Sequence, residues 1–290
     1  MSSRRIKQRF HSKPVLEGAG VHLKRAFGFH ELGQFDPFLL LDDFRSDTPA
    51  HYRKGFPWHP HRGIETITYI LRGRVEHGDS LGNAGEIDSG DVQWMTAGSG
   101  IIHQEMPKGD GDGHMDGFQL WANLPASQKM MPPRYRDITA AQIPEVVLDN
   151  GVRIKVICGR VGEVAGPVHD IVIDPEYLDV TLPADANFDH QTPVGHTVLA
   201  YIIDGLGTFG PDNNDSGPQG DGTLLLFGNG SQIEVRTADK PLRFLLISGK
   251  PLKEPIAWGG PIVMNTQDEL QLAFDEFQNG TFIKHTPPES

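Results

Sequence analysis

The chain has a single cysteine, no long apolar run and fewer basic than acidic residues. Because Cys158 is alone, no disulfide can form within the chain, and its place at the end of the apolar stretch 152–158 predicts a buried strand residue. No run of about 18 uncharged apolar residues is present to span a bilayer, and the first residues do not resemble a signal peptide. We therefore expect a cytoplasmic protein that does not bind membranes.

The charge balance disfavours direct binding to nucleic acids. The chain has 26 basic and 38 acidic residues, and its net charge of −12 repels phosphate backbones. A basic cluster does lie near the N-terminus, at Arg4, Arg5, Lys7 and Arg9. Such a terminal cluster is typical of a solvated chain end, so we assign it no function.

Several common functional motifs are missing or incomplete. The sequence has no P-loop, no Gly-x-Gly-x-x-Gly fingerprint and no Gly-x-Ser-x-Gly elbow, so nucleotide and serine-hydrolase chemistries have no support. Residues 212–217 (DNNDSG) faintly resemble a calcium-binding loop but lack its glutamate. We expect a polar hairpin loop there.

Length and composition predict a mostly β protein with two domains. The 290 residues are 38% hydrophobic, which is enough apolar side chain to build two cores. The 34 glycines and 22 prolines are spread along the chain, and short apolar runs such as 64–71 and 91–95 are followed by glycine, a pattern typical of short strands joined by turns. Pro125, Pro132 and Pro133 interrupt a polar stretch, so we predict domains at residues 1–130 and 131–290.

An internal repeat supports two copies of one domain fold. Residues 69–73 (YILRG) resemble residues 201–205 (YIIDG). In each copy a Gly-Asp pair and another apolar strand follow, at residues 90–94 and 220–225. The second copy contains no His-x-His and no His-x-Glu pair, so we expect it to lack a metal site and to act as a structural partner.

A helix is predicted near the C-terminus, over residues 267–278. Thr266 and Glu269 have the spacing of a capping box, and apolar residues follow at helical intervals up to Phe277. Gly280 follows the last of them, as is typical of a helix end. The apolar side of this helix should pack on a barrel, and we expect no cofactor role for it.

Two short strings carry most of the functional information, His59-Pro60-His61 and His103-Gln104-Glu105. In each, two metal-binding side chains are two residues apart, and a strand displays such residues on one face. Two such pairs on facing antiparallel strands would converge on one point. Three imidazoles and one carboxylate suit iron, copper, nickel, zinc or manganese better than calcium or magnesium.

Chance is the competing explanation, because a chain with 13 histidines can contain a His-x-His pair without a function. Two pairs in one domain, the second preceded by Gly98 and Gly100, are harder to dismiss. We therefore predict a mononuclear transition-metal site with one or two open positions for water, dioxygen or a substrate oxygen.

Other residues are assigned supporting roles at this site. Glu65 and Gln119 are candidates for hydrogen bonds that orient the metal ligands, or for polar residues of the pocket. Phe56, Trp94 and Met95 are candidate apolar walls, and each has ordinary core packing as its alternative.

Four longer strings resemble one family over nearly the whole chain, residues 15 to 280. They are HPHRGIETITYILRG at 59–73, GDVQWMTAGSGIIHQEMP at 90–107, DPFLLLDDF at 36–44 and GPIVMNT at 260–266. They are similar to the pirin family of the cupin superfamily. The resemblance implies a bicupin, two tandem jelly-roll β-barrels with a short C-terminal helix, and a metal held only in the N-terminal barrel.

The resemblance also implies the ligands and the metal. The family's three histidines and one glutamate fall on His59, His61, His103 and Glu105, and iron is the metal expected, with nickel, copper, manganese, zinc and cobalt as alternatives. Glu65 stands at the usual carboxylate position of the first cupin motif. We expect it to lie off the metal, because Glu105 supplies the carboxylate.

Some pirin-like proteins are similar to quercetin 2,3-dioxygenases, so the resemblance implies an oxidoreductase that acts on a small aromatic substrate with dioxygen. Glu105 would then be the catalytic base for a flavonol such as quercetin. The alternative is a metal- or redox-sensing regulatory protein that acts through a protein partner. A third reading is a physiological substrate unrelated to flavonols. We expect a monomer.

Overall fold

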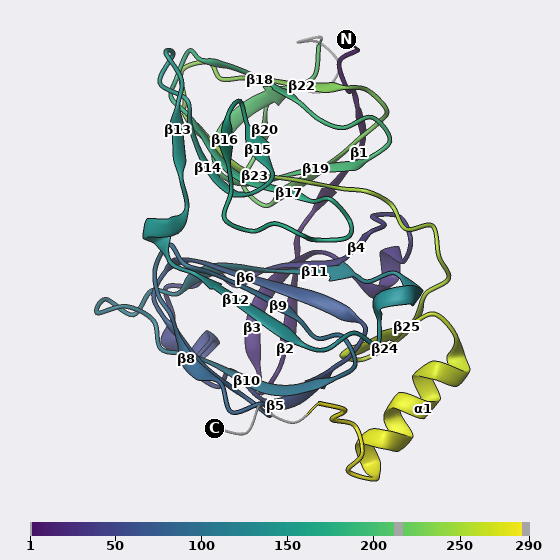
Figure 1. Cartoon of the computed structure of the whole chain (residues 1–290). Coiled ribbons are helices and arrows are strands. Elements are labelled where there is room, and N and C mark those ends of the chain that lie inside the picture. The colour runs from purple at the N-terminus through teal and green to yellow at the C-terminus, as the bar shows by residue number, and fades with distance from the viewer. Residues whose placement is uncertain (1, 212–216, 286–290) are drawn as a thin grey trace. The chain divides into compact units, whose positions relative to one another are not determined.

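The computed structural model describes residues 2–211 and 217–285, so most of the predicted loop at 212–217 lies outside the described residues (Figure 1). The chain forms two compact units, which we describe separately. The histidine barrel consists of Lys13–Ala140 and Leu252–Ser290, and the apolar barrel of Met1–Ser12 and Ala141–Pro251. This division differs from a single cut at residue 130, because residues 2–12 belong to the same unit as residues 141–251, and residues 252–285 to the same unit as residues 13–140.

The histidine barrel is built from antiparallel strands in two main sheets and the two-stranded hairpin of β24 and β25. The larger sheet has the order β12-β9-β6-β11-β4-β3-β2, and the smaller has the order β5-β10-β7-β8. Short 3-10 turns lie at Phe29–Glu31, Pro49–His51 and Ala126–Gln128, and a further one at Ala140–Gln142 starts at the unit boundary. The strands are β2 (Lys13–Glu17), β3 (Val21–Phe27), β4 (Phe38–Asp43), β5 (Phe56–His61), β6 (Ile64–Arg72), β7 (Val75–Asp79), β8 (Ala84–Ile87), β9 (Val92–Thr96), β10 (Ile101–Pro107), β11 (Asp116–Asn123), β12 (Arg134–Ile138), β24 (Ala257–Gly259) and β25 (Ile262–Met264).

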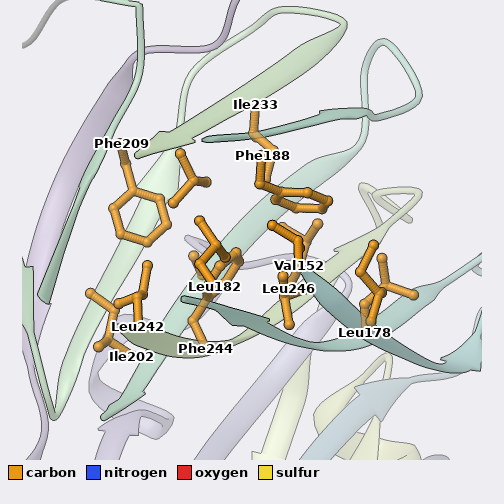
Figure 2. Packing of buried hydrophobic residues seen from close by; sticks show 14 of the residues in the cluster. Val152, Leu178, Leu182, Phe188, Ile202, Phe209, Ile233, Leu242, Phe244 and Leu246 are labelled. Carbon is orange, nitrogen blue, oxygen red and sulfur yellow. The ribbon is translucent and has the colours of Figure 1, made fainter. Parts of the chain in front are cut away.

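The apolar barrel contains one large sheet with the order β1-β21-β19-β23-β17-β14-β13, and β22 pairs with both β18 and β19. Alternating residues of these strands fill its interior with aliphatic and aromatic side chains such as Phe188, Ile233 and Phe244 (Figure 2). Its strands are β1 (Ile6–His11), β13 (Glu145–Val147), β14 (Arg153–Cys158), β15 (Arg160–Val161), β16 (Val164–Ala165), β17 (Glu176–Leu182), β18 (Asn187–Gln191), β19 (Thr197–Phe209), β20 (Gln219–Gly220), β21 (Thr223–Phe227), β22 (Gln232–Arg236) and β23 (Leu242–Gly249). Cys158 is buried at the end of β14, as predicted.

The two barrels share one strand order, which confirms the predicted repeat. The repeated strings lie on β6 and β19, and the strands that follow the Gly-Asp pairs are β9 and β21. The order β9-β6-β11-β4-β3-β2 in one sheet corresponds to β21-β19-β23-β17-β14-β13 in the other. One further strand flanks each sheet, β12 beside β9 and β1 beside β21.

The C-terminal helix α1 (Gln267–Gln278) begins and ends where the sequence predicts. Thr266 Oγ1 accepts a hydrogen bond from the Glu269 backbone at 3.2 Å, and the Glu269 carboxylate accepts one from the Thr266 backbone at 3.0 Å. Leu270 and Ala273 are buried against the hairpin of β24 and β25. Within the described residues, no helix is long and apolar enough to cross a membrane.

Candidate metal centre

Strands β5 and β10 bring three histidines of the histidine barrel together. The two strands pair antiparallel, with His103 opposite His59 and Ile101 opposite His61. One ring nitrogen from each of His59, His61 and His103 lies within 4.8 Å of the others. Within the described residues, this is the one group of three or more His, Cys, Asp or Glu side chains that could hold a metal ion.

Hydrogen bonds fix the ring tautomers of two of these histidines. Nδ1 of His59 lies 2.9 Å from the Pro57 carbonyl oxygen, and Nδ1 of His61 lies 2.9 Å from that of Pro261. Because a carbonyl only accepts, both Nδ1 atoms carry the hydrogen, and both Nε2 atoms keep a free lone pair. These two Nε2 atoms are 3.1 Å apart.

Two lone pairs this close repel unless a cation lies between them, and protons are disfavoured here. Burial lowers the pKa of His61 to about 3 and the pKa of His103 well below its ordinary value. Within the described part of the chain, both ring nitrogens of buried His103 lack a hydrogen-bond partner. Neutral imidazoles with unsatisfied nitrogens are the donors that a transition metal requires, so these residues fit such an ion.

Glu105 lies beside this group but is not part of it. A register shift in the ladder separates His103 from Glu105, which lies opposite Phe56 on β5. Its carboxylate lines the same cavity as His59, and its Oε1 lies 3.1 Å from the Thr68 hydroxyl. Burial raises the pKa of Glu105 to about 7, although the hydrogen bond from Thr68 acts against the shift. Its role as the fourth ligand stays a prediction.

His59 and His61 line a cavity of about 960 Å³. This volume lies near the upper end of the range for small-molecule sites, which is roughly 300 to 1,000 Å³. Most of the wall is apolar, and its aromatic residues include Phe29, Phe56, Trp121 and Trp258. The Trp121 ring lies edge-on to the His61 ring at 5.0 Å between centroids, and Trp258 lies 6.0 Å from Trp121.

One wall of the cavity carries a row of polar side chains. Arg25, Asp42, Gln119 and Thr68 are opposite one another on the successive strands β3, β4, β11 and β6, so they share one face. Arg25 donates two hydrogen bonds to Asp42, at 2.8 and 2.7 Å. The Thr68 hydroxyl lies 2.8 Å from the Gln119 amide oxygen and thereby joins the row to Glu105.

Of the two predicted supporting polar residues, Gln119 lies where it was expected and Glu65 does not take part in the site. Gln119 lies in the cavity wall, as expected. Glu65 lies off the three-histidine group, as expected, but the idea that it orients a ligand or lines the pocket is wrong. Strand β6 alternates its side chains, so Glu65 and Thr68 lie on opposite faces, and Glu65 accepts a hydrogen bond from Thr96 Oγ1 at 2.6 Å.

The predicted apolar walls are correct at one position of three. Phe56 lines the cavity, but Trp94 and Met95 do not. Met95 packs in an apolar cluster behind the wall residues Trp121 and Trp258, and Trp94 lies opposite Ile67 on the face of the sheet that points away from the cavity. The sequence analysis missed Trp121 and Trp258, whose positions in the wall depend on long-range folding.

The corresponding positions of the apolar barrel cannot form the same site. Strands β18 and β22 pair antiparallel, with His190 opposite Ile233 and Phe188 opposite Val235. Three of these four side chains belong to the apolar core, and Figure 2 shows two of them, Phe188 and Ile233. His190 Nε2 lies 2.8 Å from a carboxylate oxygen of Glu176.

Comparison with known proteins agrees with this architecture. Residues 20–122 match the family described as Pirin, and residues 177–283 match the Pirin C-terminal cupin domain. The chain is 43% identical to a pirin-like protein of Caulobacter vibrioides, covering 93% of this chain and 96% of that protein, and 39% identical to pirin of Homo sapiens, covering 96% and 93%. A crystal structure of quercetin 2,3-dioxygenase from Acinetobacter baumannii superposes with a TM-score of 0.86 at 32% identity, covering 97% of this chain and 99% of that one. The chain therefore belongs to the pirin family.

Proposed function

We propose that this protein is a metal-dependent dioxygenase that binds one iron ion through His59, His61, His103 and Glu105 and acts on a flavonol such as quercetin. The observation that carries the proposal is the pair of Nε2 lone pairs 3.1 Å apart in the wall of a cavity of about 960 Å³. The similarity to a quercetin 2,3-dioxygenase from Acinetobacter baumannii supports the reaction class. The preference for iron rests on the family.

The bound metal would supply a Lewis-acidic position for a substrate oxygen and one-electron chemistry toward dioxygen. The protein's own contribution begins with Glu105, which would loosen as a ligand and accept the proton of the substrate hydroxyl. The Thr68 hydroxyl lies 3.1 Å from the carboxylate oxygen Oε1 and so restricts the rotation of the carboxylate. His59 and His61 are fixed by their Nδ1 hydrogen bonds, so they need no reorganisation to bind the ion.

The cavity walls support an aromatic substrate that carries several oxygens. The rings of Phe29, Trp121 and Trp258 offer apolar faces against which a flat ring system can pack. The polar row offers Asp42 as an acceptor and Arg25 as a donor for substrate hydroxyl groups. Arg25 and Asp42 already pair with each other, and a polyphenol could add hydrogen bonds to this pair, whereas a hydrocarbon could not.

The test is turnover of quercetin under air by protein loaded with Fe²⁺, followed as flavonol loss and dioxygen uptake. His61→Ala should lose both the bound metal and turnover. His169→Ala removes an exposed histidine of the apolar barrel and should retain both. A metal-loaded protein that consumes no flavonol would refute the substrate, and a wild type without bound metal would refute the site.

A further inference from the structure

The C-terminal part of the chain reaches the metal centre through one turn. We call residues 257–283, which contain β24, β25, α1 and Phe282, the C-terminal strap. Pro261 lies in the turn between β24 and β25, and its carbonyl oxygen accepts the hydrogen bond from His61 Nδ1 at 2.9 Å. The strap therefore determines which ring nitrogen His61 presents to a metal. Trp258 and Pro261 of the strap also line the cavity.

The strap backbone packs directly on the chain that follows His61. The Val263 amide donates to the Arg62 carbonyl oxygen at 3.1 Å, and Ile262 forms a parallel bridge with Arg62. Gly63 has φ 78°, and a Cβ atom there would lie 2.0 Å from the Val263 carbonyl oxygen. Only a residue without a side chain allows this approach.

Arg62 ties the strap to both strands that carry histidines. It follows His61 on an alternating strand, so its side chain points away from the cavity, where it is buried with 2% exposure. Nε donates to the Ser99 carbonyl in the loop before β10, at 2.6 Å. Nη1 donates to Glu276 of α1 at 2.7 Å, and Nη2 donates to the Phe282 carbonyl at 2.8 Å. The guanidinium carbon also lies 4.2 Å from the centre of the Phe282 ring.

Lys129 makes a second, independent connection. Its buried Nζ donates to the Gly63 carbonyl at 2.8 Å, the Val263 carbonyl at 3.0 Å and Asn123 Oδ1 at 2.6 Å. Three acceptors satisfy the three hydrogens of an ammonium group, which offsets part of the cost of burying the charge. One side chain thus holds the strap and the segment after His61 at a fixed separation.

We propose that the C-terminal strap orients the metal ligand His61 through its Pro261 carbonyl. Arg62 and Lys129 are positioning residues that hold this carbonyl against His61. The inference rests on the three-histidine site of the proposed function but not on its flavonol substrate. Partners that orient a ligating histidine typically contribute 10- to 100-fold to metal affinity. The ligands lie within the Pirin match at residues 20–122, and the strap lies within the match to the Pirin C-terminal cupin domain at residues 177–283.

The experiment measures binding of Co²⁺ to the full-length protein by competition with a chelator, together with the visible absorption of the bound ion. Arg62→Lys keeps the charge, but its single Nζ cannot reach all three acceptors, which Arg62 contacts through three separate nitrogens. Glu276→Gln weakens the contact between Arg62 and α1 from the helix side. Both variants should bind Co²⁺ about 10-fold more weakly, with a changed visible spectrum. Asp275→Asn is the matched control, because it removes an exposed carboxylate of the same helix that does not contact Arg62.

The possible results distinguish a failure of the strap proposal from a failure of the metal site itself. Weaker Co²⁺ binding and an altered spectrum in Arg62→Lys and Glu276→Gln, but not in Asp275→Asn, would support the proposal. Lower melting temperatures with wild-type affinity and spectrum would show a purely structural contact and overturn it, leaving the metal site intact. A wild type that binds no Co²⁺ would overturn both. If Arg62→Lys does not fold, Glu276→Gln alone decides the question.

Discussion

The Thr68 hydroxyl has one proton and two acceptor atoms in reach, Oε1 of Glu105 at 3.1 Å and the amide oxygen of Gln119 at 2.8 Å. All three groups have a partner when the NH₂ group of Gln119 faces Thr68 and donates to its hydroxyl oxygen. The Thr68 hydroxyl then donates its own hydrogen to Glu105. Thr68→Val keeps the shape of the side chain but removes this donor. We expect the variant to bind metal more weakly at neutral pH while the fold is retained.

The magnitude follows from the charge on the carboxylate. A hydrogen bond to a charged group contributes about 1.5–3 kcal/mol, which equals roughly one to two pKa units. Burial already raises the pKa of Glu105 to about 7, and the loss of Thr68 should raise it further. A raised pKa means that the acid form, which cannot bind a metal, persists to higher pH. Apparent metal affinity at pH 7 should therefore fall about ten-fold, and the deficit should shrink as the pH rises through the new pKa.

The assay is Co²⁺ binding to wild type and variants by chelator competition, at pH 7 and pH 9. Thr66→Val is the matched control, because Thr66 is buried two residues earlier on the same face of β6 and loses the same hydroxyl. Equal losses in the two variants would refute the role of Thr68. So would a deficit in Thr68→Val that is unchanged at pH 9, since Glu105 is then expected to be ionised in the wild type and about half ionised or more in the variant.

Three further predictions concern stability of the metal-free protein, measured by urea unfolding. Thr266→Ala removes the acceptor for the Glu269 amide and should destabilise the protein by about 1 kcal/mol, so an unchanged midpoint would contradict the cap. Gly63→Ala places a Cβ atom 2.0 Å from the Val263 carbonyl at positive φ and should cost about 3 kcal/mol or more; wild-type stability would rule out this close packing. Burial raises the pKa of Asp42 to about 6, so the folded state holds its proton longer than the unfolded state does. Stability should fall by up to about 3 kcal/mol as pH rises from about 4 to about 6, and Asp42→Asn should lack this slope; a slope equal to that of wild type would assign it to other groups.

The three-histidine group could be predicted because it depends on local geometry. A strand places residues i and i+2 on one face, so the spacing of His59 and His61 predicts their shared direction without knowledge of the fold. Antiparallel pairing then requires only that β5 and β10 be neighbours, which the structure shows. The position of Glu105 was harder to predict, because the register shift after His103 leaves no signal in the sequence.

The cavity walls could be predicted only in part, because they depend on which face of each strand points inward. Trp94 and Met95 are adjacent on β9, so the alternation of a strand already excludes that both line one cavity. The polar row from Arg25 to Thr68 has no such signal, because its members come from four strands and meet only through the register of the sheet.

The contacts of the C-terminal strap could not be predicted from patterns of neighbouring residues. The capping box predicts α1 because it involves residues three apart, but the contacts of Arg62 with Glu276 and Phe282 join residues 214 and 220 positions apart. The entropic cost of closing such a loop grows only slowly with its length, so a long separation does not prevent the contact. The buried charge of Arg62 selects its partners, because a guanidinium group with 2% exposure is stable only when several acceptors bind it. An arginine that follows a ligating histidine, on the opposite face of a strand next to glycine, therefore predicts that another segment covers it, although it cannot name that segment.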